Sequence, residues 1–133
     1  MSDNRHISDE YAAIGEMLIA NYDEFKDIRE AEITIVYLAS TQAKKQKGKL
    51  VFGQCEKIAD KYKWGIPADF TITVFEPNIE GFTPEQVEAL IFHELLHVGV
   101  EDDRLFIRPH DIEDFSAALK KYGVDWATLP FES

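Results

Sequence analysis

The chain has 133 residues, of which 45% are hydrophobic and 29% charged, and its formal net charge is -11. These values favour a single domain over residues 1–133 that buries its own hydrophobic core. The acidic balance argues against a general nucleic-acid binder, because phosphate contacts need clustered Lys and Arg. With one cysteine, no long apolar run and a polar N-terminus, the sequence predicts a cytoplasmic protein without a membrane span or an internal disulfide.

The first half of the chain predicts one helix and two strands. An apolar stripe at helical spacing predicts a helix over residues 9–25, with Ser8 as its N-cap. β-branched and aromatic residues with apolar character on both faces predict a central strand over residues 32–38. The lysine-rich stretch 40–48 is interpreted as an exposed, solvated loop. A strand over residues 49–55 follows, interrupted by a glycine.

The second half contains the best-marked helix. Clean alternation predicts a strand over residues 69–75. Thr83 then has the features of an N-cap, Gln86 completes a capping box, and the apolar periodicity runs through His97. Gly99 is placed to end this helix in a left-handed turn. We expect a mixed α and β domain.

Two further elements are expected after this helix. Residues 105–107 favour a short strand, and residues 111–122 favour a last helix. The following residues are expected to pack back on the domain as a short tail.

The segment His93-Glu94-Leu95-Leu96-His97 carries the strongest chemical signal. Two histidines four positions apart on a helix are offset by only roughly 40° around its axis, so both imidazoles can reach one zinc ion. Glu94 lies on the flank of the same face, where its carboxylate can reach a metal-activated water without binding the metal. The pattern therefore predicts a hydrolytic zinc site with Glu94 as the general base.

A catalytic zinc ion usually takes three protein ligands and leaves one position for water. His110, just before the last predicted helix, is the candidate for the third ligand. Glu113 and Asp114 are the rivals, since a carboxylate from a downstream helix can replace a histidine. His6, the remaining histidine, is expected to lie in a frayed end.

Several residues are candidates for supporting roles. Asp111 and Asp114 could accept the second N–H of a ligand imidazole, or could favour the helix dipole. Tyr37 and Tyr122 are candidates for stabilising an oxyanion, although nothing selects either one. Cys55 is interpreted as a small, buried side chain rather than a ligand.

The motif and its surroundings resemble those of the phage metallopeptidases, a zincin-like group of HExxH zinc peptidases. The resemblance rests on residues 89–99, on the segment 109–115 and on the stretch 69–77 ahead of the helix, so it covers the C-terminal half of the chain well and the N-terminal half only loosely. It implies a minimal zincin fold: a small mixed sheet of about three to four strands, an N-terminal helix, the motif helix and a C-terminal helix. It also implies His93, His97 and His110 as ligands, Glu94 as catalytic base, and a phage or prophage origin.

The leading hypothesis is a zinc-dependent peptidase that acts on a protein or peptide substrate. Zincins commonly hold the substrate as a strand added to an edge beside the motif helix, and residues 69–75 are the candidate edge. Two alternatives remain open at this point. One is a zinc-bound but inactive binding module, and the other is an acidic protein that mimics a nucleic acid.

Overall fold

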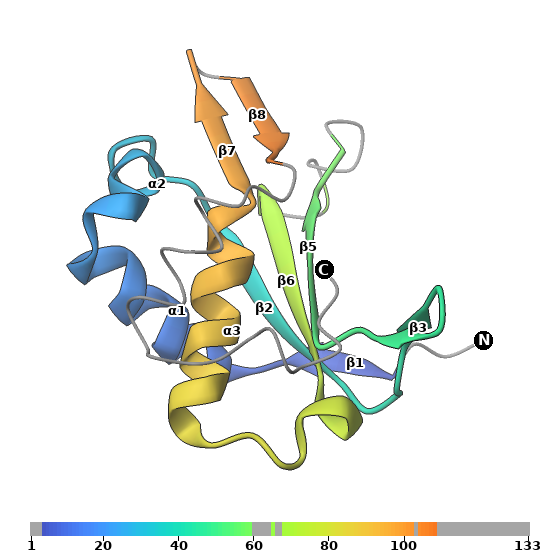
Figure 1. Ribbon diagram of the computed structural model, residues 1–133. Helices are drawn as coiled ribbons and strands as arrows, with labels where there is room; N and C mark the ends of the chain where they lie inside the picture. Colours follow the sequence, from blue (N-terminus) through green and yellow to red (C-terminus); the bar gives the residue numbers. More distant parts are fainter. Residues whose placement is uncertain (1–3, 60–64, 66–67, 103, 109–133) are drawn as a thin grey trace.

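A four-stranded mixed sheet forms the centre of the computed structural model, which describes residues 4–59, 65, 68–102 and 104–108 (Figure 1). The strand order is β1-β2-β6-β5. β1 (Arg5–Ile7) is antiparallel to β2 (Ile35–Ser40), β2 is parallel to β6 (Phe70–Phe75), and β6 is antiparallel to β5 (Gly53–Lys57). Helices lie against one face of this sheet, so the α+β class predicted from the sequence is confirmed.

The first helix, α1 (Asp9–Asn21), begins where the sequence predicts, since the Ser8 hydroxyl oxygen accepts the backbone N–H of Tyr11 at 3.1 Å. It ends four residues before the predicted boundary. A 3-10 turn, η1 (Asp23–Phe25), and a short helix, α2 (Lys26–Glu30), follow. The Arg29 guanidinium donates to the carbonyls of Ile19 and Tyr22 at 2.5 and 2.9 Å. These bonds satisfy carbonyl groups left over at the helix end and stabilise the break.

Strand β2 is central, as predicted, but lies two to three residues further along the chain. The chain leaves α2 through a turn in which Glu32 has a φ of 54°. The first residues of the predicted strand belong to this turn and the connection after it, so β2 begins only at Ile35. The expectation of a frayed end around His6 is wrong. His6 pairs with Ala39 in strand β1, because the N-terminal segment adds to the free side of β2.

The lysine-rich stretch forms part of a hairpin instead of an irregular loop. β3 (Lys45–Gln46) pairs with β4 (Lys49–Leu50), and the two connecting residues, Lys47 and Gly48, have φ values of 53° and 78°. Two positive φ values at the centre of a two-residue loop are typical of a type I′ turn, whose twist matches that of a hairpin. The predicted strand over residues 49–55 is therefore divided into β4 and β5.

Strand β6 provides the core face that the alternation predicts, with Phe70, Ile72 and Val74 all fully buried. Its position in the sheet differs from the expected one. β6 lies between β2 and β5, so the proposed substrate-binding edge over residues 69–75 is wrong. Both sides of β6 are hydrogen-bonded to neighbouring strands, and among the described strands the edge on this side of the sheet is β5.

Helix α3 (Pro84–Leu96) follows the 3-10 turn η3 (Glu76–Ile79) and has the predicted capping box. The N–H of Gln86 donates to the Thr83 hydroxyl at 3.2 Å, and the N–H of Thr83 donates to the Gln86 side chain at 2.9 Å. Every residue from Ala89 to Leu96 is buried. The ring of Phe92 packs edge-on against those of Tyr22 and Phe25, which joins α3 to the α1–α2 layer.

A hairpin of β7 (Val98–Glu101) and β8 (Arg104–Ile107) follows α3 directly, so the predicted short strand near residue 105 is confirmed. The left-handed turn expected at Gly99 is wrong, because Gly99 lies within β7 and the positive φ values among the described glycines are confined to Gly48. A Cβ at Gly99 would lie 2.5 Å from the ring of Phe106. The glycine is needed for close packing across the hairpin.

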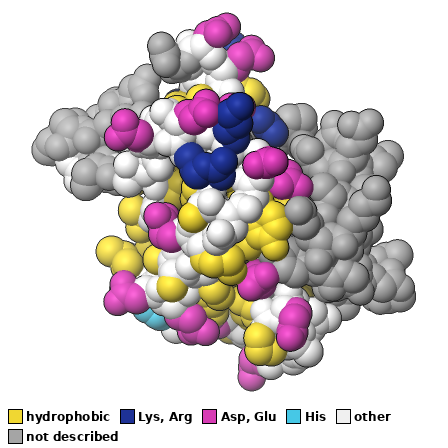
Figure 2. Space-filling view, turned by 90° about the vertical axis from the view of Figure 1, so that its left-hand side faces the viewer, with side chains coloured by type: hydrophobic (Ala, Val, Ile, Leu, Met, Phe, Trp, Pro, Cys, Tyr) yellow, Lys and Arg dark blue, Asp and Glu magenta, His cyan; other side chains and the backbone are white. Residues whose placement is uncertain are grey.

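The outer face of the α1–α2 layer carries acidic side chains spread over the described surface, with Lys and Arg gathered in one place (Figure 2). None of the helices in the described part of the chain combines the length and the hydrophobicity that a membrane span requires. The predicted last helix over residues 111–122 and the tail after it lie outside the described residues.

Candidate active site

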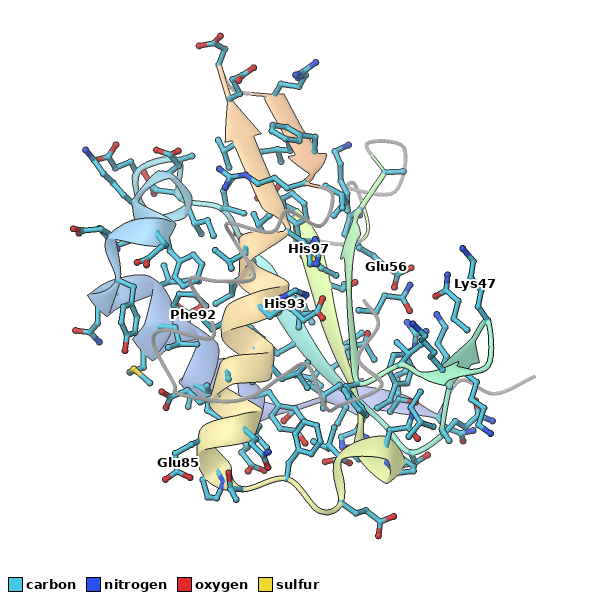
Figure 3. All side chains as sticks on the ribbon, in the orientation of Figure 1. Lys47, Glu56, Glu85, Phe92, His93 and His97 are labelled. Atoms are coloured by element: carbon cyan, nitrogen blue, oxygen red, sulfur yellow. The ribbon has the colours of Figure 1, made fainter. Side chains whose placement is uncertain are left out.

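His93 and His97 lie at the C-terminal end of α3 with their rings turned toward each other (Figure 3). Their Nε2 atoms are 3.4 Å apart, and the ring planes are inclined at 86°. Two nitrogens that each bind one tetrahedral zinc ion at about 2.05 Å lie about 3.3 Å apart. The spacing of the two Nε2 atoms therefore fits two ligands of a single metal ion.

The second histidine is held by the chain that returns from the β7–β8 hairpin. Nδ1 of His97 lies 2.7 Å from the carbonyl oxygen of Arg108, and the N–H of Arg108 donates to the carbonyl of His97 at 2.7 Å. A carbonyl oxygen can only accept, so Nδ1 carries the hydrogen and Nε2 of the neutral ring keeps its lone pair. This is the tautomer that a metal bound at Nε2 requires.

Glu94 is completely buried and faces strand β5. A Cβ added at Gly53 would lie 3.2 Å from both Cγ and Oε2 of Glu94, so the backbone of β5 approaches the carboxylate as closely as a residue without a side chain permits. The glycine thus leaves space for the Glu94 carboxylate beside the strand. This places the acidic group of the motif between its helix and the edge of the sheet.

Cys55 lies two residues beyond Gly53 on β5 and is half-buried. Burial, followed by the nearby Glu94 and Glu56 carboxylates, raises the pKa of its thiol well above the ordinary value of 9.0. The thiol therefore stays protonated at neutral pH. A protonated thiol is neither a good nucleophile nor a metal ligand. The side chain packs against the core but is only partly buried, less than the sequence predicts.

Tyr37 belongs to the hydrophobic core. Its ring occupies the space in which a side chain at Gly15 of α1 would lie, and burial raises the pKa of its phenol. The Tyr37 ring therefore packs between β2 and α1 as part of the core. Tyr122, the other candidate for an oxyanion stabiliser, lies outside the described residues.

Three candidate ligands and one supporting carboxylate also lie beyond the described part of the chain: His110, Glu113, Asp114 and Asp111. Within the described part, no three His, Cys, Asp or Glu side chains are grouped so that they could hold a metal ion. The structure brings the imidazoles of His93 and His97 together and places the Glu94 carboxylate beside Gly53. It describes the chain up to Arg108, two residues before His110.

Sequence reasoning missed two backbone features of the site, the close approach of Gly53 and the carbonyl of Arg108. A glycine within a strand often marks a place where another group comes near the backbone, so Gly53 carried a usable signal. The carbonyl of Arg108 had no corresponding signal in the sequence. Every residue has a carbonyl, and only the hairpin brings this one to His97.

A mixed sheet covered by helices, with an HExxH helix packed beside an edge strand, is the arrangement of a small zincin-like domain. The chain belongs to the family described as "Putative phage metallopeptidase", whose sequence model matches residues 4–131. The sequence resemblance to this family, which the motif and its surroundings indicate for the C-terminal half, therefore covers nearly the whole chain. Membership implies a metal cofactor and a protein substrate. Searches of the curated proteins and of the solved structures found no match.

Proposed function

We propose that the protein is a zinc-dependent peptidase in which His93 and His97 bind the metal and Glu94 is the general base. The observation that carries this proposal is the 3.4 Å separation of the two Nε2 atoms, together with the hydrogen bond that leaves the lone pair of His97 on Nε2. Two histidines serving only as core or surface residues would require neither feature.

His110 is the proposed third ligand, because the β7–β8 hairpin shortens its route to the site. The hairpin leaves α3 at Val98 and ends at Ile107, which pairs with Val98, so Arg108 lies beside His97 again. Two more residues span at most about 7 Å along the chain. His110 is thus within reach of the same metal, whereas Glu113 and Asp114 require a longer path.

The zinc ion, when bound, supplies an activated water at neutral pH and polarises the scissile carbonyl. Glu94 takes up the proton of the attacking water and later delivers it to the leaving amine. Its complete burial strengthens its electrostatic interactions there, because the local dielectric is lower than that of water.

Strand β5 is the proposed binding edge for the substrate. Among the strands that the structure describes, it is the edge on the side of the sheet where Glu94 lies, and a Cβ added at its residue Gly53 would lie 3.2 Å from that carboxylate. A peptide added to β5 would gain main-chain hydrogen bonds irrespective of its side chains, and its backbone would pass Glu94. This arrangement corrects the expectation that β6 is the edge and keeps the same recognition mode.

The proposal is tested with zinc-reconstituted protein and an unbiased peptide library. We expect about one equivalent of zinc and cleavage by the unaltered chain, and retained zinc without cleavage for Glu94→Gln. Glu85→Gln is the matched control, since it makes the same change at an exposed position of α3. Cleavage by Glu94→Gln at the unaltered rate would contradict the assignment of the base.

The zinc content decides among the alternatives. Stoichiometric zinc without cleavage of any library member would favour an inactive binding module. Less than about a tenth of an equivalent after reconstitution would contradict the metal site itself, since structural and catalytic zinc sites bind tightly at pH 7.

A further inference from the structure

A strongly basic surface feature stands out on this acidic protein. The β3–β4 hairpin carries Lys45, Lys47 and Lys49 within five residues, with Lys47 in the turn and the other two in the strands, and all three are exposed. None of them forms an ion pair with a residue in the described part of the chain. The chain has 25 acidic and 14 basic residues, yet the positive charge of these three lysines is not balanced by an ion pair with any described residue.

The hairpin is held firmly at its base. Asn78 donates from its side-chain amide to the carbonyls of Lys44 and Val51, at 2.9 and 2.8 Å, and so joins the two ends of the hairpin. Lys44 itself bonds to Gln54 of β5 at 2.5 Å and lies over the ring of Phe75. The Lys44 side chain is therefore occupied by contacts within the domain. Lys45, Lys47 and Lys49 are exposed instead, on a hairpin whose base is fixed by hydrogen bonds.

The hairpin also lies along the proposed substrate path. β4 ends at Leu50 and β5 begins at Gly53, the residue at which an added Cβ would lie 3.2 Å from the Glu94 carboxylate. Lys49 is four residues before Gly53, which corresponds to about 13 Å of extended chain. In Figure 3 the hairpin, with Lys47 at its tip, projects past β5 on the side away from α3.

We propose that this hairpin, defined by Lys45, Lys47 and Lys49, recognises acidic side chains of the peptide substrate on the C-terminal side of the cleaved bond. The inference rests on the proposed peptidase function. A strand that adds to β5 in the antiparallel direction, the more stable of the two pairings, runs from the Lys57 end toward the Gly53 end. Residues after the bond beside Glu94 then pass toward the lysines.

Charge complementarity is the physical basis of the selection. Each exposed Lys–carboxylate pair changes the cleavage rate of a peptide at limiting concentration by roughly twofold to fivefold, the range expected for surface ion pairs. Three lysines on one hairpin can attract acidic side chains at several positions of the peptide, so the selection does not depend on one exact position. Because these pairs are exposed, the preference should weaken as the salt concentration rises.

The test compares two peptides that the protein cleaves, one with Glu at about three to six residues after the bond and one with Gln at the same positions. The unaltered chain should cleave the Glu peptide with the higher kcat/KM, by roughly tenfold at low salt. Lys47→Glu should lower the ratio of the two rates, and the triple change to Glu at Lys45, Lys47 and Lys49 should invert it. Lys26→Glu, an exposed lysine of α2, is the matched control and should leave the ratio unchanged.

The outcomes separate this inference from the function on which it rests. Equal cleavage of the two peptides, or a preference for acids only before the bond, would overturn the hairpin's role while leaving the peptidase intact. Absence of cleavage of any peptide would overturn the peptidase proposal. Binding of a labelled Glu peptide to the zinc-loaded Glu94→Gln variant, measured by anisotropy, then tests the hairpin without catalysis. Tighter binding of a DNA oligonucleotide than of the Glu peptide would also overturn the inference.

Discussion

His97 and Arg108 are joined by two hydrogen bonds of 2.7 Å, although eleven positions separate them in the chain: the imidazole Nδ1 of His97 donates to the Arg108 carbonyl, and the Arg108 N–H donates to the His97 carbonyl. One bond fixes the ring, and the other closes the base of the β7–β8 hairpin. A change in the hairpin should therefore reach the metal site through His97, even if it touches no proposed ligand.

Gly99→Ala should disturb that link. The added methyl group would lie 2.5 Å from the Phe106 ring, so either the ring or the strand must move. We expect a loss of about 1–3 kcal/mol in the free energy of unfolding, as for overpacked cores. Zinc affinity should fall with it, by roughly tenfold, as for the loss of a group that orients a ligand. Chemical denaturation and competition with a zinc chelator measure the two effects. Phe106→Leu added to Gly99→Ala should restore part of both, and failure to do so would mean that the ring is not the obstacle.

Gly53→Ala should act on catalysis through Glu94. A Cβ at this position lies 3.2 Å from the carboxylate oxygen Oε2 and from Cγ, so the side chain must shift by a few tenths of an ångström. We expect kcat to fall by about tenfold with little change in KM, because a small misplacement of a general base is costly. Bound zinc should stay near one equivalent. Gly81→Ala, where a Cβ meets nothing within 4 Å, is the control and should retain full activity.

Lys47→Asn should stabilise the fold. Lys47 has a φ of 53°, in the left-handed region that Asn tolerates better than Lys does, at the first central position of a type I′ turn. We expect a gain of about 0.5–1 kcal/mol in the free energy of unfolding, measured by urea titration. Lys45→Asn removes the same charge from a strand position and should be neutral or slightly destabilising. A gain of equal size from both variants would point to charge rather than backbone conformation.

Cys55 should react slowly with thiol reagents in the folded protein. Burial and the Glu94 and Glu56 carboxylates raise the pKa of its thiol above 9.0, so the thiolate fraction at pH 8 is smaller than for an unfolded chain. Labelling with a disulfide reagent should be slow in buffer and fast in denaturant. Equal rates in the two conditions would show that the thiol is accessible.

The same pKa shift predicts a loss of stability in alkali. Because the folded chain holds the thiol proton more tightly than the unfolded chain, the stabilisation is complete below about pH 9 and is lost as the pH rises above it. Cys55→Ala should flatten the decline of the unfolding free energy between pH 9 and 10.5. An unchanged slope would show that other groups, such as the buried Tyr37 phenol, dominate.

Local signals in the sequence determined much of this protein. Ser8, Thr83 and Gln86 define helix starts through hydrogen bonds to residues three positions away, and the alternation of Phe70, Ile72 and Val74 defines a core face. The spacing of His93 and His97 likewise predicts two imidazoles on one side of a helix. Each of these features depends on neighbours in sequence, so local physical rules are enough to find it.

Tertiary structure alone decided which strand is the edge and how the site is supported. Of the strands described, β5 is the edge because β2 and β5 both pair with β6, and no local pattern specifies pairings over such separations. The approach of Gly53 to Glu94 follows from that order, and the bond from His97 to Arg108 follows from the return of a hairpin. The sequence alone predicts the chemical groups of the site, whereas packing over long sequence separations decides which backbone atoms lie beside them.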